Sequence, residues 1–222
     1  MKIEENKYHK GFFITFEGPD GSGKTSVVAC IYKYLRKKFP HCVVTTREPG
    51  GTNNPIAEDI RKIILNKLDY KIIPMTEALL FAASRAQHIN DFIMPNLNKG
   101  KIVLCDRFVH SSYIYQGIAR GLGLEIVKKI NDFSLKGLWP NLIFVLMLKP
   151  SIGIERIKSN KKREFNRIDA ESLKLHNKVY LGYKKLVKKY PKNTVMIDAN
   201  QKLDLVVKNI IKIIDKKLIN YA

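Results

Sequence analysis

Acidic residues are scarce in this chain of 222 residues, where twenty Asp and Glu stand against forty Lys and Arg and leave a formal net charge of +20. Such an excess attracts polyanions such as nucleotides, nucleic acids or an acidic membrane surface. Most of it lies in short lysine pairs on helical stretches, such as Lys184 with Lys185 and Lys188 with Lys189, which are typical of a solvated helix face. Binding to nucleic acid is therefore the less favoured interpretation.

Cysteine is also rare, and Cys30, Cys42 and Cys105 are widely spaced, in no CxxC or Cys/His grouping. The sequence thus predicts neither a disulfide framework nor a zinc site, and a reducing cytoplasm fits it. Long apolar runs are missing too, since the strongest, at residues 142–148, is far too short to cross a bilayer and the first residues, MKIEENKYHKG, are polar. We therefore expect neither secretion nor a membrane anchor.

The rest of the composition, 45% hydrophobic and 27% charged, is ordinary for a globular protein, and the length favours one domain over two. Short apolar runs alternate with longer amphipathic stretches, the pattern of a parallel sheet covered by helices. Strands are expected at residues 12–17, 42–46, 102–105, 142–148 and 194–197. Helices are expected at residues 24–38, 55–65, 75–98, 125–135, 151–158, 170–190 and 203–218, with Pro95 ending or bending the third. Right-handed crossovers would bring the carboxyl ends of all strands to one edge, where ligands bind.

Residues 18–25 read GPDGSGKT and fit GxxxxGK[ST], between an apolar run and an amphipathic helix. In this context the pattern predicts a phosphate-binding loop, because glycines let successive backbone N–H groups turn toward phosphate oxygens and the helix start adds a favourable dipole. Lys24 would reach the β- and γ-phosphates, and Thr25 would ligate Mg²⁺. Asp20 is an unusual acid for such a loop, although Asp also favours turns. ATP is expected to contact Gly18, Pro19, Asp20, Gly21, Ser22, Gly23, Lys24, Thr25 and Ser26.

Two further strand ends carry charged residues. Arg47 follows the second expected strand, where an arginine can clamp a phosphate. Asp106 ends the third, at the place where P-loop enzymes hold Mg²⁺ with an acid. Arg107 beside it needs an anion, which is either a substrate phosphate or an internal partner, Asp106 or Glu17.

With these motifs in place, the sequence resembles the thymidylate kinase family from residue 12 to the last helix. The resemblance rests on the phosphate loop with Asp20, TREPGGT at 46–52, ALLFAASRAQH at 78–88 and DRFVHSSYIYQG at 106–117, in the order and spacing of the family. It implies an α/β P-loop NTPase fold, with a parallel sheet of about five strands flanked by helices. It also implies transfer of the γ-phosphate of ATP to dTMP with Mg²⁺, and a homodimer by analogy.

Roles for single residues follow from the same resemblance. Phe81 would stack on thymine and Arg85, one helical turn later on the same face, would hydrogen-bond the ring carbonyl. Arg107 would hold the dTMP phosphate with Arg47 as its helper, and Tyr115 would crowd the 2′ position of the sugar. The dTMP site would comprise Asp20, Arg47, Phe81, Arg85, Arg107, Ser111, Ser112, Tyr115 and Gln116, with the metal at Thr25 and Asp106.

A basic segment, RIKSNKKREFNR at 156–167, resembles the mobile lid of the family, so we expect one P-loop kinase domain over residues 1–222 with a lid at about 156–168. Transfer of a γ-phosphate needs spread positive charge. In the family an arginine in the phosphate loop or in the lid supplies it, and here the loop holds Gly21. Arg163 is then the first candidate and Arg167 the second, followed by Arg156, Lys161 and Lys162; Arg156 and Arg167 are also expected at ATP, and a solvated charge run is the plain alternative. The expected catalytic set is Asp20, Lys24, Arg107 and Arg163.

Two rival functions remain at this point. One is a kinase for dUMP, another nucleoside monophosphate or a deoxynucleoside. The other is a nucleic-acid-binding ATPase, for which the sequence offers no aromatic-interleaved basic groove or known module. We expect ATP and dTMP as partners, and neither nucleic acid nor membrane.

Overall fold

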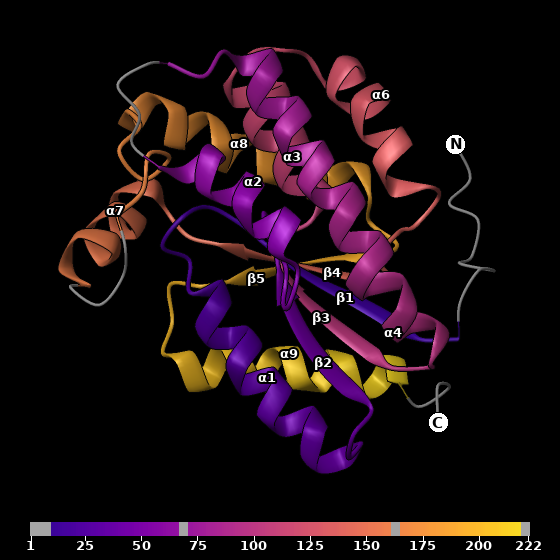
Figure 1. Ribbon diagram of the computed structural model, residues 1–222. Helices are drawn as coiled ribbons and strands as arrows, with labels where there is room; N and C mark the ends of the chain where they lie inside the picture. Colours follow the sequence, from indigo (N-terminus) through magenta and orange to yellow (C-terminus); the bar gives the residue numbers. More distant parts are fainter. Residues whose placement is uncertain (1–9, 67–70, 161–164, 219–222) are drawn as a thin grey trace.

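A five-stranded sheet forms the centre of the protein, in a computed structural model that describes residues 10–66, 71–160 and 165–218 (Figure 1). All its neighbours are parallel, in the order β2-β3-β1-β4-β5. The strands are β1 (Phe12–Glu17), β2 (Val43–Arg47), β3 (Ile102–Asp106), β4 (Leu142–Met147) and β5 (Thr194–Asp198). The five expected strands and the α/β class are thus confirmed, with strand ends displaced by at most one residue.

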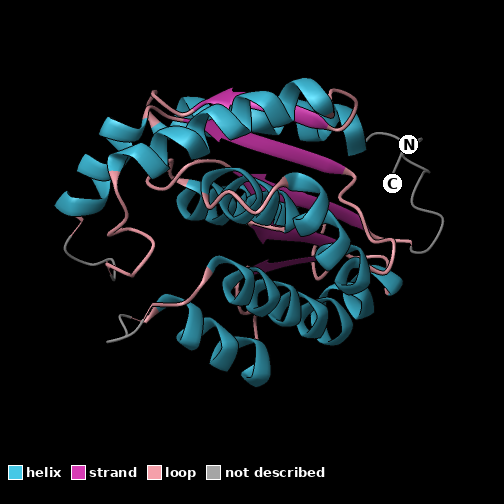
Figure 2. Cartoon of the chain, turned by 90° about the horizontal axis from the view of Figure 1, so that it is seen from above, coloured by secondary structure: helices cyan, strands magenta, loops and turns pink. Residues whose placement is uncertain are grey.

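Helices cover both faces of the sheet, which explains why β4 is buried along its whole length and reads as a continuous apolar run. On one face lie α1 (Lys24–Lys38) and α9 (Leu203–Leu218), and their side chains share one core cluster with the sheet (Figure 1). Two further clusters fill the other face under the remaining helices. Figure 2 shows the sheet between these layers, with all strand arrowheads toward one edge.

The remaining helices include one long stretch with a π-helical part and one short irregular stretch. Their bounds are α2 (Pro55–Leu65), α3 (Pro74–His88), η1 (Ile89–Ile93), α4 (Met94–Asn98), α5 (Val109–Ser112), η2 (Tyr113–Ala119), α6 (Leu124–Leu135), α7 (Pro150–Ser159) and α8 (Leu173–Lys189). The expected helix at 75–98 is divided by the π-helical η1 and not ended by Pro95, which lies in the first turn of α4 where its missing N–H is tolerated.

Two other helical expectations need correction. The helix expected from residue 170 begins at Leu173, because Ser172 caps it by accepting from the Leu175 N–H at 3.3 Å. No helix was predicted for the stretch of α5 and η2, and the structure is helical there. Its residues are buried almost all round, so it has no amphipathic period that the sequence could reveal. Among the described residues, the structure contains no helix with the length and apolarity to span a membrane.

Candidate active site

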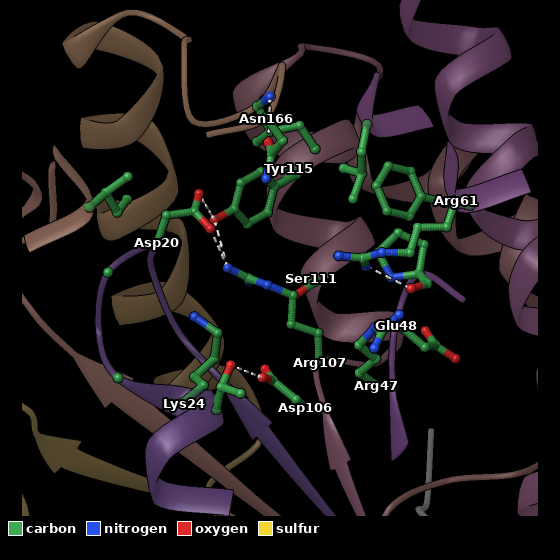
Figure 3. A pocket seen from close by; sticks show the side chains of 18 of the residues that line it. Asp20, Lys24, Arg47, Glu48, Arg61, Asp106, Arg107, Ser111, Tyr115 and Asn166 are labelled. Atoms are coloured by element: carbon green, nitrogen blue, oxygen red, sulfur yellow. Dashed lines mark hydrogen bonds and ion pairs between the residues drawn. The ribbon is translucent and has the colours of Figure 1, made fainter. Parts of the chain in front are cut away.

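A cleft of about 490 Å³ opens at the carboxyl edge of the sheet (Figure 3). Sheet register explains its position. Arg47 at the end of β2 lies opposite Asp106 at the end of β3, and Asp106 lies opposite Phe16, two residues before the phosphate loop. The ends of three neighbouring strands therefore place Arg47, Asp106 and the phosphate loop next to one another.

The phosphate loop joins β1 to α1. Gly18, Gly21 and Gly23 all have positive φ, which turns the backbone around the loop. The ammonium group of Lys24 donates to the carbonyls of Gly18 at 3.1 Å and Pro19 at 2.8 Å. Burial lowers the pKa of Lys24 to about 7, and the neighbouring Arg107 adds to the effect. A phosphate bound here would favour the charged form of this lysine and raise its pKa.

Gly21 has no room for a side chain. A Cβ built there would lie 2.2 Å from the carbonyl oxygen of Gly153 in α7, and its φ of +74° is unfavourable for other residues. The loop therefore packs on the helix that leads into the basic segment. An arginine could not occupy this position without moving the backbone.

Asp20, Arg107 and Tyr115 form the centre of the cleft (Figure 3). Arg107, with φ of +69°, donates to the carbonyl of Gly18 at 3.0 Å, the hydroxyl of Ser111 at 3.1 Å and the carboxylate of Asp20 at 2.5 Å. Tyr115 donates its hydroxyl to the other carboxylate oxygen of Asp20 at 2.7 Å. The internal partner of Arg107, expected to be Asp106 or Glu17, is Asp20. Burial alone would raise the pKa of Asp20, but Arg107 and Lys24 outweigh it and lower the pKa.

The residues expected to hold metal lie together. The hydroxyl of Thr25 donates to a carboxylate oxygen of Asp106 at 2.6 Å, and both residues line the cleft. These are hard oxygen donors at the mouth of a phosphate-binding loop. They fit Mg²⁺, which takes one or two protein oxygens and completes its shell with phosphates and water.

The expected acceptor residues divide into two groups. Phe81, Ser111, Tyr115 and Gln116 line the cleft, whereas the described part of its wall does not include Arg85 or Ser112. Arg85 is 2% exposed and donates to Glu48 at 2.8 Å, to Ser112 at 3.1 Å and to the side-chain oxygen of Asn131. The guanidinium thus lies behind the wall, already held by polar partners.

Glu48, which lines the cleft, was given no role from the sequence although it lies within TREPGGT. One oxygen accepts from Arg85, and the other lies 3.2 Å from Nδ1 of His88. The second ring nitrogen of His88 is 2.6 Å from the hydroxyl of Thr46. A buried chain of polar contacts therefore runs from Thr46 near the end of β2 to Arg85, and of its members only Arg85 was predicted to have a role.

Arg47 lies on the wall as expected, but half exposed and paired with both carboxylate oxygens of Glu58 at 2.9 Å. Arg61 lies on α2, three residues after Glu58. It also reaches the wall and donates to the carbonyl of Pro49 at 2.8 Å. No role was predicted for Arg61, since an arginine on an amphipathic helix usually faces solvent.

Of the basic segment, Arg156 lines the cleft and donates to the carbonyl of Ala199 at 3.3 Å. Arg163, with Lys161 and Lys162, lies outside the described residues. Arg167 is not among the described wall residues, and its guanidinium donates to Glu77 at 2.6 Å. Asn166 takes its place on the wall.

Three buried residues lie beneath the centre. Glu17 was considered only as a partner of Arg107, and no role was predicted for His176 or Tyr183. Glu17 accepts from the Phe108 N–H at 2.8 Å, the hydroxyl of Ser111 at 2.7 Å and that of Tyr183 at 3.0 Å, and burial raises its pKa. Nδ1 of His176 lies 3.9 Å from Asp20. His176 and Tyr183 are seven residues apart on α8 and so share a face, which is the one signal that could have paired them.

Comparison with known proteins agrees with this geometry. A family model described as Thymidylate kinase matches residues 16–210. The chain is 48% identical over 198 residues to a thymidylate kinase of Clostridium novyi, covering 89% of this chain and 95% of the relative. It is 47% identical over 209 residues to one of Halalkalibacterium halodurans, covering 94% and 98%. A crystal structure of thymidylate kinase from Ehrlichia chaffeensis superposes with a TM-score of 0.74 at 28% identity, over 92% of this chain and 98% of that one.

These matches run through the phosphate loop, the sheet and both sides of the cleft. The fold is that of P-loop NTPases, and the chain belongs to the thymidylate kinase family, whose enzymes transfer the γ-phosphate of ATP to dTMP.

Proposed function

We propose that one P-loop domain carries out this reaction in the cleft, with ATP on the phosphate loop and dTMP between Arg107, Phe81 and Gln116. The observation that carries the proposal is the position of Arg107. Its guanidinium lies beside the Gly18 carbonyl of the donor loop and the Ser111 hydroxyl of the acceptor wall, so an anion bound there would sit between the two. In-line transfer needs such a meeting point, and no covalent intermediate.

On the donor side, we propose that the backbone of residues 18–26 and the ammonium of Lys24 bind the ATP phosphates. The proposal is supported by the positive-φ glycines and by a lysine whose buried ammonium faces only neutral carbonyls and a serine at hydrogen-bond distance among the described residues. Arg156, on the wall near the start of the basic segment, would extend this site. Arg163 of the lid would add charge to the transition state. We do not assign Arg167 to ATP, because its guanidinium is held by Glu77.

On the acceptor side, Arg107 would bind the dTMP phosphate, with Arg47 as a weaker helper since Glu58 already occupies its guanidinium. Phe81 would stack on the base, and Arg85 would act from behind the wall through its position next to Ser112. Tyr115 is fixed by its bond to Asp20 and would limit space at the sugar.

We propose that Thr25 and Asp106 hold Mg²⁺ together with the ATP phosphates. The support is the pair of hard oxygens 2.6 Å apart at the loop. The ion would neutralise phosphate charge when bound.

The test is an ADP-release assay with dTMP, dUMP, dGMP, dCMP, AMP and thymidine as acceptors. We expect dTMP to give the highest kcat/KM. A preference for another monophosphate, or for thymidine, would identify the kinase rival. ATP hydrolysis that needs no acceptor and rises with added DNA or RNA would identify the other rival.

A homodimer is the quaternary state we propose. Apolar side chains are exposed on α2, α3 and α6, of which α2 and α6 both pack against α3, and they include Leu79 at 51%, Ile126 at 45% and Phe133 at 85% (Figure 1). Because the chain has a net charge of +20, contact between two copies through such apolar side chains is favoured over contact through basic ones. Light scattering should give a particle of twice the chain mass, and the double variant Leu79→Glu/Phe133→Glu should give a particle of one chain mass. A monomeric parent would refute the proposal.

Since both substrates are charged nucleotides of the cell interior, we propose the cytoplasm as the compartment.

A further inference from the structure

Glu77 is a buried carboxylate outside the cleft wall that joins three separate parts of the chain. It lies in the first turn of α3 and is 1% exposed. It accepts from the amide of Gln116 at 2.9 Å, from Arg120 at 3.2 Å and from Arg167 at 2.6 Å. Burial opposes its ionisation, but Gln116, Arg120 and Arg167 outweigh burial and lower the pKa of Glu77. The carboxylate is therefore charged near neutral pH and binds all three donors at once.

Arg167 is fixed at both its backbone and its side chain. The backbone N–H donates to the carbonyl of Leu65 at 3.1 Å, and the guanidinium Nε donates to that of Ile64 at 2.9 Å. Four residues later, Glu171 binds Arg120 at 2.6 Å. The chain that follows the basic segment is thus tied to the end of α2, the start of α3 and the end of η2. The three contacts of Arg167 hold the carboxyl end of the basic segment in place, and the Glu171–Arg120 pair lies beyond that segment.

Gln116 is the part of this network that reaches substrate space, because it lines the cleft. A carboxylate can only accept hydrogen bonds, so Glu77 requires the NH₂ group of Gln116 to face it. The amide oxygen of Gln116 is then the atom left for another partner. A neutral residue at position 77 would remove this preference for one amide orientation.

We propose that Glu77 is a positioning residue for phosphate transfer, which orients Gln116 toward the acceptor and fixes the end of the lid through Arg167. The inference rests on the proposed acceptor role of Gln116. It makes the acceptor wall and the base of the lid one connected unit. Through Glu77, a change at either place reaches the other.

The first experiment compares Glu77→Gln with Glu171→Gln. Both remove one carboxylate from Arg120, but only the first removes the partner of Gln116 and Arg167. We expect Glu77→Gln to raise the KM for dTMP about tenfold or more and to lower kcat, and Glu171→Gln to change each less than about threefold. Equal effects of the two variants, at matched thermal stability, would overturn the proposal.

The second experiment is a double-mutant cycle on Gln116→Ala and Arg167→Gln. No direct bond joins these two residues in the described network, and they share Glu77. If Glu77 couples them, the combined loss in kcat/KM for dTMP will be smaller than the product of the single losses; independent effects would overturn the coupling. This cycle decides the matter even if Glu77→Gln fails to fold. A normal dTMP KM in Gln116→Ala would instead refute the acceptor role of Gln116, and with it the basis of the inference.

Discussion

The guanidinium of Arg107 donates to the carboxylate of Asp20 over 2.5 Å, so a cation from the end of β3 and an acid from the phosphate loop meet at the centre of the cleft. An acceptor phosphate arriving here would compete with Asp20 for the same N–H groups. The pair thus keeps the guanidinium in place and charged before substrate binds.

Arg107→Ala should damage the acceptor side selectively. Loss of one partner from a buried, hydrogen-bonded charge pair costs about 2–5 kcal/mol, which corresponds to a rise in the KM for dTMP of about 30-fold or more. Arg47→Ala is the matched comparison and should have a smaller effect, because Arg47 is half exposed and bound to Glu58. The two substrates are varied separately. An equal rise in the KM for ATP would mean that Arg107 serves the donor or the fold.

Binding of ATP should take up a proton at Lys24. In the free protein its pKa is about 7, so at pH 8 most molecules carry it neutral. ATP phosphates favour the ammonium form and raise this pKa, so binding at pH 8 should take up to about one proton, and much less at pH 6, where the lysine is already charged.

Calorimetry in buffers of different ionisation enthalpy measures this uptake directly. Lys24→Met should bind ATP weakly, should lose the uptake and should abolish transfer. Uptake at pH 8 that persists in Lys24→Met would assign the proton to another group.

Gly21→Ala should destabilise the free protein more than Gly23→Ala. Both glycines have positive φ, +74° and +84°, which costs another residue about 1–2 kcal/mol. Only at Gly21 does the added Cβ meet backbone, the Gly153 carbonyl at 2.2 Å, whereas at Gly23 no described atom lies within 4 Å. Thermal unfolding without nucleotide gives the comparison. Equal losses would show that α7 moves freely away from the loop.

Arg163→Ala should lower kcat far more than either KM, because an arginine that acts on the transferring phosphate contributes mainly in the transition state. The loss can reach about 10³-fold. Lys158→Ala, which removes an exposed cation of α7, is the control for a general loss of charge. Single-turnover rates with both substrates saturating measure the step. A fall of only a few-fold would contradict this role for Arg163, and Arg47 would be the next candidate for the transition-state cation.

The fold was predictable because its strands are apolar runs that helices cover on both faces, and its phosphate loop has a strict spacing. The stretch of α5 and η2 was not, since burial on every side leaves no period to read. The sequence also could not predict that the side chain of Arg167 turns away from the cleft wall, for a different reason. Its partner Glu77 is ninety positions away in the chain. The basic segment alone does not show which of its arginines would bind ATP and which holds the segment to the rest of the fold.

The same limit applies to Arg85. Its position four residues after Phe81 predicts a shared helix face, but the contacts with Glu48 and Asn131 that hold it behind the cleft wall come from β2's following loop and from α6. Burial of an arginine depends on partners gathered by the whole fold. A motif can therefore identify the residue without predicting its burial or its hydrogen-bond partners.

The sheet register has a consequence for how this chain can vary. Arg47, Asp106 and the phosphate loop meet because β2, β3 and β1 end level with one another. Exchange of one apolar residue for another inside these strands leaves that alignment intact. A single inserted or deleted residue in β3 turns its side chains to the opposite face and moves Asp106 and Arg107 along the strand by about 3.3 Å. Insertions and deletions among related chains should therefore occur mainly in loops at the amino edge of the sheet, even where apolar residues inside the strands are exchanged.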